Sequence, residues 1–287
     1  MYKIAILGCE NSHANSFLDL IYTKKEYPDI EVVGIYSEEA EAANKLSDAY
    51  GVYVAKSYDE FVGKIDGVVI TARHGDNHYK YAKPYIESGI PMFLDKPVVI
   101  SEEDAVNIKA ELIKNNVKVC GGSSLKHALL IAELKKAVSE KTYGKVYGGY
   151  LRASLKMENP YGDFFFYAQH LVQMAGEVFG YNPISVKAYE MKGDVINCVL
   201  RYEDIDVNMA YVENNDDFYA GISCEKDCIM KQATLDGCFA REFAEFYGIL
   251  TGGEQPQSYD EFFSVVYTMN AIERSLKSGN EETIIYK

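Results

Sequence analysis

The segment Phe93-Leu94-Asp95-Lys96-Pro97 places a lysine between a carboxylate and a proline, at the end of a predicted buried strand. Proline fixes its own φ and biases the preceding residue towards extended backbone, so the strand is expected to end here. In a parallel α/β sheet, ligands bind at the carboxyl ends of the strands. Lys96 is therefore a candidate to contact a hydroxyl, a phosphate or an amide of a ligand, although a solvated turn lysine would give the same pattern.

The first turn of the chain also has residue types that suggest binding. The apolar run Ile4–Leu7 leads into Gly8-Cys9-Glu10-Asn11-Ser12-His13, at the point where a dinucleotide-binding domain carries G-x-G-x-x-G/A. Glu10 replaces the second glycine and brings a negative charge close to where a diphosphate would lie. If its side chain turns out to solvent, the amides of Asn11 and Ser12 at a helix start can still hold the phosphates.

The end of the second expected strand is the usual place for an acidic residue that bonds the ribose of a dinucleotide. Ser37 stands at that place, within Tyr36-Ser37-Glu38. A serine leaves room for a 2′-phosphate, but no arginine follows at once to bind one. Glu38 is left as either a ribose contact or a residue of the next helix's first turn, and the choice between NAD and NADP stays open.

The chain has five histidines, and none follows residue 170: His13, His74, His78, His127 and His170. Each falls at a predicted strand end or on an element expected to face a cleft, which indicates titratable groups near a site, or ordinary caps and turns. His74-Gly75-Asp76-Asn77-His78 could converge on a cation. We favour a helix cap or a cofactor contact for His78 instead, and we predict no metal site.

Two kinds of structure must position these residues. In the first third, short β-branched runs alternate with helical patterns, which is typical of a parallel sheet covered on both faces. The strands are expected at Lys3–Leu7, Glu31–Tyr36, Gly67–Thr71, Pro91–Leu94 and Lys118–Cys120. The helices are expected from Ser12, over Glu38–Tyr50, over Asn77–Ser88, and from Ser101, which is a candidate N-cap, to Asn115.

After Gly121-Gly122 the pattern changes to longer strands, and the connections between the strands from Ser185 to Thr234 are short enough to permit only antiparallel pairing. These strands are expected at Lys145–Leu155, Ser185–Met191, Val195–Tyr202, Asp206–Val212, Tyr219–Cys224, Ile229–Thr234 and Glu282–Tyr286. Helices are expected at Leu125–Ser139, Phe164–Phe179, Phe239–Leu250 and Tyr259–Leu276. We predict an α/β protein with a Rossmann dinucleotide-binding domain at 1–121. An α+β substrate-binding domain with a mainly antiparallel open sheet follows at 122–287.

Composition narrows the class of partner. The chain has 287 residues and a formal net charge of −14, which disfavours a nucleic-acid surface and favours a small-molecule ligand. No apolar run is long enough for a signal segment or a membrane span, so we expect a cytoplasmic protein. The six cysteines are scattered, and buried thiols are their expected state.

Several of these motifs together carry a family likeness. Gly8, the run Val69-Ile70-Thr71-Ala72 leading to His78, Asp95-Lys96-Pro97, Gly144-Lys145-Val146 before a long strand, and His170 on the following helix occur in an informative order. In this order and spacing, the chain resembles the glucose-fructose oxidoreductase/inositol dehydrogenase (Gfo/Idh/MocA) family over nearly its whole length. The resemblance implies a Rossmann domain that holds NAD or NADP and a second domain that contacts substrate.

The resemblance also implies roles for particular residues. Lys96 matches the lysine of the family's Glu-Lys-Pro motif, with Asp95 in place of the glutamate. His170 matches a histidine usually found as Asp-x-x-x-His, which acts in proton transfer, but Phe166 occupies the aspartate position. His170 could act as the base alone, or Lys96 or Tyr167 could share that work.

The motifs and the resemblance together give a set of candidate contacts. The candidate cofactor contacts are Gly8, Glu10, Asn11, Ser12, His13, Ser37, Thr71, Ala72, Arg73, His78, Asp95 and Lys96. The candidate substrate contacts are Lys126, Tyr161, Asp163 and His170. The aromatic residues beside His170 suit the apolar C–H faces of a sugar or cyclitol, although aromatic residues on a buried helix are more often core.

The leading hypothesis is an NAD(P)-dependent oxidoreductase that acts on a secondary alcohol or ketone of a sugar, cyclitol or small polyol. A second hypothesis is a non-catalytic or regulatory nucleotide- or sugar-binding member of the same fold, because three functional positions are altered. A metal-assisted lyase or hydrolase is a third. The resemblance further implies a homodimer or homotetramer formed through the C-terminal sheet.

Overall fold

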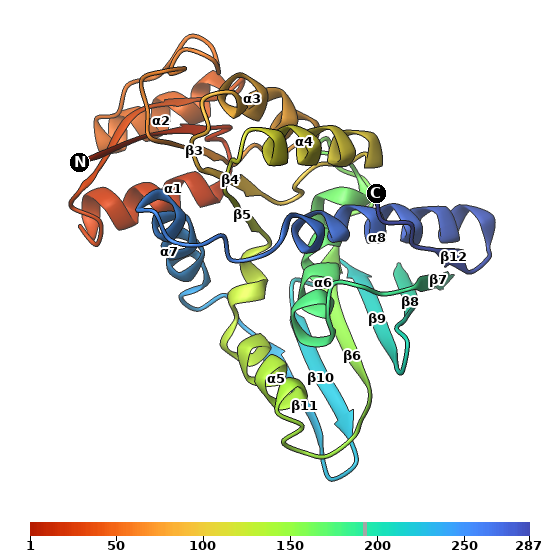
Figure 1. Ribbon diagram of the computed structural model, residues 1–287. Helices are drawn as coiled ribbons and strands as arrows, with labels where there is room; N and C mark the ends of the chain where they lie inside the picture. The colour runs from red at the N-terminus through yellow and green to blue at the C-terminus, as the bar shows by residue number, and fades with distance from the viewer. Residues whose placement is uncertain (192–193) are drawn as a thin grey trace. The chain divides into compact units, whose positions relative to one another are not determined.

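The computed structural model describes residues 1–191 and 194–287 and divides into two compact units (Figure 1). The first unit comprises Met1–Gly122 and Phe239–Tyr259, and the second comprises Ser123–Cys238 and Asp260–Lys287. The units divide one residue beyond the predicted boundary. They differ from the prediction at Phe239–Tyr259, which we had assigned to the second domain and which belongs to the first unit.

The first unit is built on a five-stranded parallel sheet of order β2-β1-β3-β4-β5. Its strands are β1 (Tyr2–Leu7), β2 (Ile30–Tyr36), β3 (Gly67–Ile70), β4 (Met92–Asp95) and β5 (Val119–Gly122). The strands read as nearly continuous apolar runs because helices cover both faces of the sheet. This is the predicted Rossmann arrangement, with strand boundaries shifted by one or two residues.

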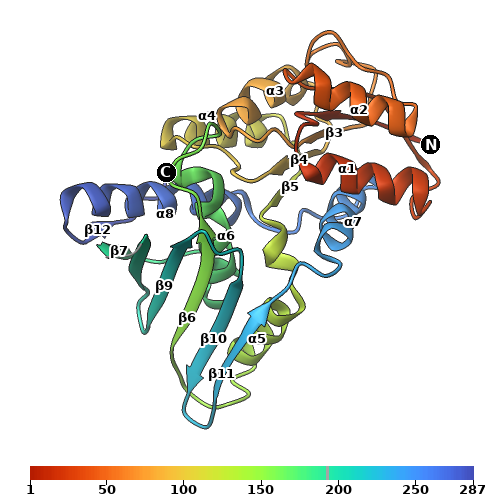
Figure 2. The same ribbon diagram turned by 180° about the vertical axis from the view of Figure 1, so that it is seen from behind.

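The helices of this unit begin close to the predicted positions. They are α1 (Ser12–Leu18), which continues as the π-helical turn η1 (Asp19–Thr23), α2 (Ala40–Tyr50), α3 (Asp76–Ile86) and α4 (Glu102–Lys114). Ser101 caps α4 as predicted, because its hydroxyl accepts a hydrogen bond from the amide of Asp104 at 3.0 Å. In both views α3 and α4 cover one face of the sheet and α1 lies on the other (Figures 1 and 2).

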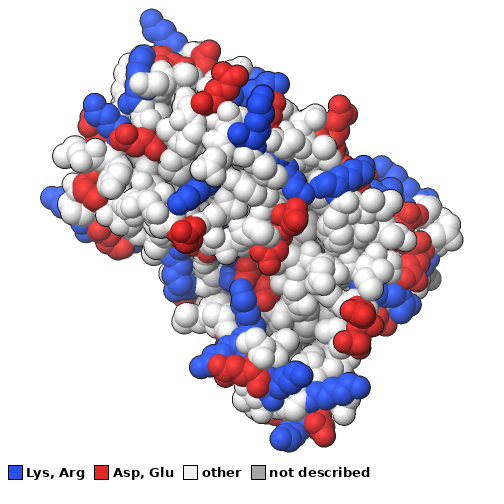
Figure 3. Space-filling view, viewed as in Figure 1, with Lys and Arg blue, Asp and Glu red and all other residues white. Residues whose placement is uncertain are grey.

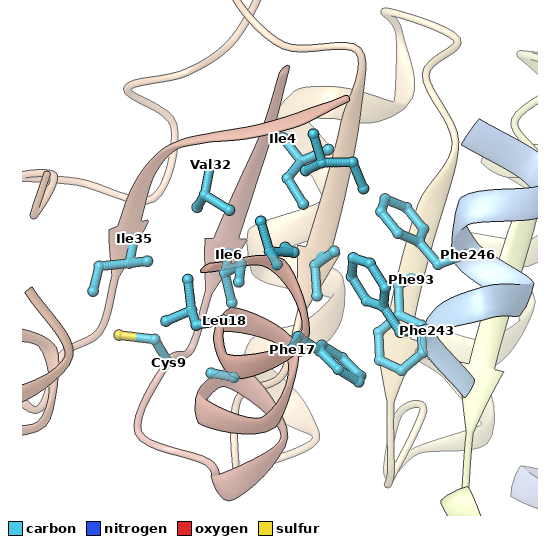
Figure 4. Packing of buried hydrophobic residues seen from close by; sticks show 14 of the residues in the cluster. Ile4, Ile6, Cys9, Phe17, Leu18, Val32, Ile35, Phe93, Phe243 and Phe246 are labelled. Carbon is cyan, nitrogen blue, oxygen red and sulfur yellow. The ribbon is translucent and has the colours of Figure 1, made fainter. Parts of the chain in front are cut away.

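Helix α7 (Cys238–Leu250) lies beside α1 and completes the covering of that face. Its apolar side is aromatic, and the ring of Phe243 lies 5.0 Å from that of Phe17, which in turn lies 5.3 Å from Phe93 on β4 (Figure 4). All three rings are fully buried. The sheet therefore buries one face only after a segment from the last fifth of the chain has packed against it.

The second unit contains a seven-stranded sheet of order β11-β10-β6-β9-β8-β7-β12. Its strands are β6 (Val146–Leu155), β7 (Ser185–Met191), β8 (Val195–Arg201), β9 (Asp206–Glu213), β10 (Phe218–Cys224), β11 (Cys228–Ala233) and β12 (Glu282–Thr283). The sheet is mainly antiparallel as predicted, but β6 and β9 pair in parallel. This parallel pair is possible because β6 and β9 are not consecutive strands, and a helix and a hairpin connect them.

The helices of the second unit are the 3-10 turn η2 (Ser124–His127), α5 (Leu129–Ser139), α6 (Phe164–Phe179) and α8 (Tyr259–Ser278). Helices α5 and α6 cover one face of the sheet, and the strands are seen uncovered from the other side (Figure 2). Tyr147, Tyr150 and Met230 on the strands β6 and β11 are exposed. Oligomer formation through this sheet stays a prediction.

Two further observations concern the charged surface and the length of the helices. On the face shown in Figure 3, Lys and Arg side chains are interspersed with Asp and Glu. Among the described residues, no helix is both long and apolar enough to cross a membrane.

Candidate active site

The first turn is clamped against the end of β3. Gly8 has φ 75°, and a Cβ there would lie 2.3 Å from backbone atoms of Ala72, so only glycine fits. The hydroxyl of Thr71 donates to the carbonyl of Gly8 at 3.0 Å. Thr71 and Ala72 thus support the turn, and their predicted contacts with a cofactor stay predictions.

Glu10 is held by two hydrogen bonds and does not meet the condition, a side chain turned out to solvent, under which the helix amides alone would hold the phosphates. Its carboxylate accepts a hydrogen bond from the hydroxyl of Ser37 at 2.7 Å and one from the backbone amide of Arg73 at 2.9 Å. These two donors attract the carboxylate and fix it at the end of β2. A carboxylate is therefore present where the sequence offers only a serine, and it comes from the first turn.

The surroundings of this carboxylate are consistent with a fixed position. Ser37 also accepts the amide of Glu39 at 3.0 Å, which holds its hydroxyl oxygen in place. Burial, with the charge of Glu10 as the second cause, raises the pKa of the Cys9 thiol to about 12. Glu38, the other candidate ribose contact, is exposed and pairs with Lys80 at 2.8 Å.

Asp95 and Asn11 link the first turn to the end of β4. The Nδ2 of Asn11 donates to Oδ2 of Asp95 at 3.0 Å, and the Lys96 amide donates to Oδ1 at 2.7 Å. Asn11 also caps α1 by accepting the His13 amide, while Ser12 is exposed. The carboxylate of Asp95 thus accepts hydrogen bonds from two residues of the first unit. Lys96 follows directly and is 6% exposed.

His78 is enclosed within the first unit. Its ring has no exposed surface, and its two nitrogens lie 3.1 Å from the carbonyl of Val98 and 2.8 Å from that of Ala72. Burial lowers the pKa of His78, and the charge of Asp95 and the two carbonyls oppose that shift. His78 therefore braces two loops of the first unit, which supports neither the predicted cofactor contact nor a role as a metal ligand.

The rest of the His74-to-His78 segment gives no further support to a metal site. His74 Nδ1 lies 3.8 Å from Asp76 Oδ2 and accepts the amide of Asp76 at 3.3 Å. The third hypothesis needed these histidines to converge with Asp76 on an ion. Both nitrogens of His78 face carbonyl oxygens, so this histidine is not placed to bind an ion together with His74 and Asp76.

In the second unit, His170 on α6 has a partner that the sequence analysis missed. Its Nδ1 lies 2.6 Å from the hydroxyl of Ser123, and both side chains are buried. The Ser123 oxygen also accepts the amide of Leu125 at 3.2 Å, so the hydroxyl is fixed at the start of η2. Ser123 orients the imidazole where the family's motif would use a carboxylate at the position of Phe166.

Aromatic residues surround this histidine within the second unit. The ring of Tyr167 lies 5.5 Å from that of His170 and 4.9 Å from that of Phe166, which also contacts Tyr161 at 5.2 Å. The ammonium of Lys156 lies 5.2 Å from the centre of the Tyr167 ring. Three of the candidates from the sequence therefore lie in one aromatic cluster: His170, Tyr167 and Tyr161.

Two other substrate candidates have separate surroundings. Lys126 is buried in η2, three residues after Ser123. Asp163 precedes α6, has φ 49°, and lines a cavity of about 590 Å³ in the second unit. Six acidic residues line that cavity: Glu158, Asp163, Glu190, Asp194, Glu213 and Glu273. The predicted substrate contacts of Lys126 and Asp163 stay predictions.

Residues 2–123 match the family model described as "Oxidoreductase family, NAD-binding Rossmann fold", which is the Gfo/Idh/MocA family. This region belongs to the Gfo/Idh/MocA oxidoreductases. The resemblance inferred from the sequence motifs is thereby confirmed, as is the expectation of a nicotinamide dinucleotide as cofactor. No curated protein matches the chain at the sequence level.

Solved structures match the fold over its whole length at low sequence identity. A putative myo-inositol dehydrogenase from Sinorhizobium meliloti has a TM-score of 0.84 at 17% identity, covering 99% of this chain and 100% of its own. A myo-inositol dehydrogenase from Corynebacterium glutamicum has a TM-score of 0.83 at 19% identity, covering 100% of both chains. A scyllo-inositol dehydrogenase from Lactobacillus casei, with bound NAD(H) and scyllo-inositol, has 0.83 at 13%, covering 99% of both.

The residues of the first unit fit a dinucleotide. The turn at Gly8 leaves no room for a side chain, α1 begins four residues later, and the Glu10 carboxylate lies at the end of β2, where a ribose is expected. The chain therefore has a Gly8 turn, a helix start and a carboxylate at the end of β2, although only the first glycine of the fingerprint is present.

Proposed function

We propose that this protein is an NAD-dependent oxidoreductase that acts on a secondary alcohol or the corresponding ketone of a cyclitol, sugar or small polyol. When bound, the nicotinamide ring supplies the hydride acceptor or donor. The observation that supports a catalytic rather than a purely binding role is the buried His170, held by Ser123 at 2.6 Å.

His170 would exchange the proton of the reacting hydroxyl. If Nδ1–H donates to the Ser123 oxygen, Nε2 is left with the lone pair that accepts a proton. After protonation, Nδ1–H still donates to the same oxygen, so the ring need not turn during the reaction. Ser123 thus serves both protonation states without adding a charge.

Glu10 would set the choice of dinucleotide. The carboxylate held by Ser37 and Arg73 can accept hydrogen bonds from the adenosine ribose, whose 2′-hydroxyl is a donor. A 2′-phosphate at the same place would meet a like charge, which is unfavourable. We therefore expect NAD to bind more tightly than NADP.

Lys96 would orient the reacting oxygen or the cofactor amide through its ammonium group. Lys96→Met removes that charge with little change in side-chain length, so it should lower kcat by far more than it raises the Kd for NAD. Turnover close to that of the wild type would rule out this role.

The substrate class rests on the aromatic residues beside His170. Tyr161, Phe166 and Tyr167 offer ring faces to the C–H patches of a polyol ring, while its hydroxyls need polar partners. The inositol dehydrogenases with which the chain shares its fold bear names that fit this class.

Calorimetric titration of the purified protein with NAD(H) and NADP(H), followed by a panel of inositols, sugars and linear polyols, tests the proposal. We expect micromolar binding of NAD(H) and reduction of NAD by at least one cyclic polyol. Failure of both dinucleotides to bind would reject the oxidoreductase proposal.

A second candidate is favoured by one observation, the absence of a carboxylate at the position of Phe166. A binding or regulatory protein with this fold would not need to stabilise an imidazolium. Tight NAD binding without turnover across the whole panel would support that candidate instead.

A further inference from the structure

We propose that His13, Asp95 and Glu242 in the first unit bind a divalent transition-metal ion, for which Zn²⁺ is the first probe. The three side chains come from α1, the end of β4 and α7, which are far apart in sequence. Their ligand atoms all lie within 4.8 Å of one another. No step of the proposed reaction uses this cluster.

The spacing of the atoms fits an ion. Nδ1 of His13 lies 3.1 Å from Oδ2 of Asp95 and 3.4 Å from Oε2 of Glu242. Ligands about 2.1 Å from a zinc ion are separated by roughly 3.0 to 3.4 Å, depending on whether the geometry is octahedral or tetrahedral. Two of the three distances therefore match those between ligands of one ion, and the third, between the two carboxylates, is within 4.8 Å.

The surroundings of Nδ1 of His13 favour a bound ion over a hydrogen bond. Nδ1 of His13 is buried and makes no well-directed hydrogen bond among the described residues, although two carboxylate oxygens are within 3.4 Å. Buried polar atoms are nearly always satisfied. An imidazole nitrogen placed between two carboxylate oxygens is a donor set that suits a divalent metal ion.

Burial makes the cluster selective for a strongly bound cation. His13 is 4% exposed, and Asp95 and Glu242 have no exposed surface. The His13 ring packs against Phe239 at 4.7 Å and Phe17 at 6.1 Å, which gives the cluster an apolar surround. Coulomb attraction between a dication and two carboxylates is strongest in such a place.

The carboxylate of Asp95 is oriented from outside the cluster. Asn11 donates to its Oδ2 and the amide of Lys96 donates to its Oδ1, so rotation of the group is blocked. Outer hydrogen bonds of this kind hold metal ligands in place in known sites.

The sequence carries a sign of the third ligand. On α7, Glu242 lies on the same side as Phe246 and Ile249, at spacings of four and seven residues, so a glutamate interrupts the apolar stripe that faces the sheet. A bound ion would link α7 to α1 and to β4, one residue before Lys96. We assign it a structural role.

The experiment uses the untagged protein from cells grown with zinc, purified without chelator and analysed by mass spectrometry for Mn, Fe, Co, Ni, Cu and Zn. We expect about one equivalent of one of these metals per chain in the wild type and less than about 0.1 in Glu242→Gln. Glu245→Gln, three residues along the same helix, is the matched control and should retain the metal.

Thermal unfolding provides a second readout that does not depend on the folding of a variant. Wild type treated with EDTA should gain roughly 5 °C in Tm on addition of Zn²⁺, and Glu245→Gln should gain the same. His13→Gln and Glu242→Gln should gain nothing. Neither readout involves a dinucleotide, so the result is independent of the proposed function.

A wild-type protein that purifies without stoichiometric metal, and whose Tm is unchanged by Zn²⁺ after EDTA treatment, would overturn the proposal. The cluster would then be a histidine packed between two carboxylates without an ion. Loss of metal from Glu245→Gln as well as from Glu242→Gln would also contradict it, because the ion would not depend on this glutamate.

Discussion

The end of β2 and the helix α6 each lack an acidic residue where the family resemblance leads us to expect one, and a different kind of side chain lies at each place. At the end of β2 the missing acid is replaced by another carboxylate, that of Glu10, which reaches across from the first turn to Ser37. On α6 the missing acid is replaced by the neutral hydroxyl of Ser123, which reaches His170 from the start of η2. The end of β2 therefore has a carboxylate that comes from another segment, whereas the histidine on α6 has a neutral hydroxyl as its partner.

The difference teaches which property each position needs. A ribose contact needs acceptors of fixed geometry, and a carboxylate from any nearby element provides them. A catalytic histidine needs an orienting partner first and a charge second, since a hydroxyl can hold both of its protonation states. The experiments below test each half of this comparison.

The largest effect is expected from His170→Gln. The amide keeps a hydrogen-bonding side chain but cannot exchange a proton, so kcat should fall by roughly 100-fold to 10,000-fold. The Kd for NAD, measured by calorimetry, should stay unchanged because the substitution lies outside the first unit. Full activity would mean that another group, such as Tyr167, is the base.

Glu10→Gln tests the carboxylate that lies at the end of β2. We expect the Kd for NAD to rise about 10-fold or more, because a charged hydrogen bond contributes roughly 1.5 to 3 kcal/mol. The preference for NAD over NADP should shrink at the same time. Glu38→Gln is the matched control and should leave both Kd values unchanged; the reverse pattern would assign the ribose to Glu38.

Ser123→Ala tests the neutral hydroxyl that holds the His170 ring. Loss of the hydroxyl leaves Nδ1 of His170 without this partner, and we expect kcat to fall about 10-fold with little change in KM. Ser123→Thr retains the hydroxyl and should restore most of the activity. Ser124→Ala, at the next buried position, should behave as the wild type, and an equal loss there would point to a general packing defect.

The smallest effect is expected from His78, which affects stability alone. Because burial lowers its pKa in the folded state, the unfolded chain binds more protons between that value and an unfolded pKa of about 6.5. The unfolding free energy contributed by His78 is therefore complete above pH 6.5 and is lost as pH falls, by at most about 1.4 kcal/mol per unit.

Denaturant titrations of the wild type and His78→Gln between pH 7.5 and 5 would measure that slope. We expect the variant to show a smaller loss of stability on acidification. A wild-type protein that gains stability from His78 as pH falls would mean that the carbonyls of Ala72 and Val98 outweigh burial.

Much of the fold could be predicted from the sequence because its signals are local. Continuous apolar runs marked the five parallel strands, and the bounds of α6 and β7 agree with the prediction to the residue. The parallel pairing of β6 with β9 could not be predicted in this way, since connection length constrains only consecutive strands. The return of Phe239–Tyr259 to the first unit was missed because amphipathicity shows that a helix packs, but not on which sheet.

The candidate site was predicted in part for the same reason. Lys96 and His170 stand out by their motifs, whereas Ser123 has no motif and is recognised only by its distance from His170. A polar pair, Ser123-Ser124, directly after the glycines that end β5 was the available signal. Glu10 was noticed as an anomaly, but the hydrogen bonds that fix it come from Ser37 and Arg73, and tertiary contacts of this kind leave no pattern in the sequence.

The late return of α7 bears on how the chain folds as it leaves the ribosome. Domains generally form in order from the N-terminus during synthesis. The first unit cannot do so, because Phe17 gains the cover of Phe243, and Phe93 that of Phe246, only after α7 has been made. At usual elongation rates that wait after residue 122 lasts on the order of ten seconds. During it the nascent sheet carries an uncovered aromatic face, which makes this interval the stage at which a chaperone would be needed.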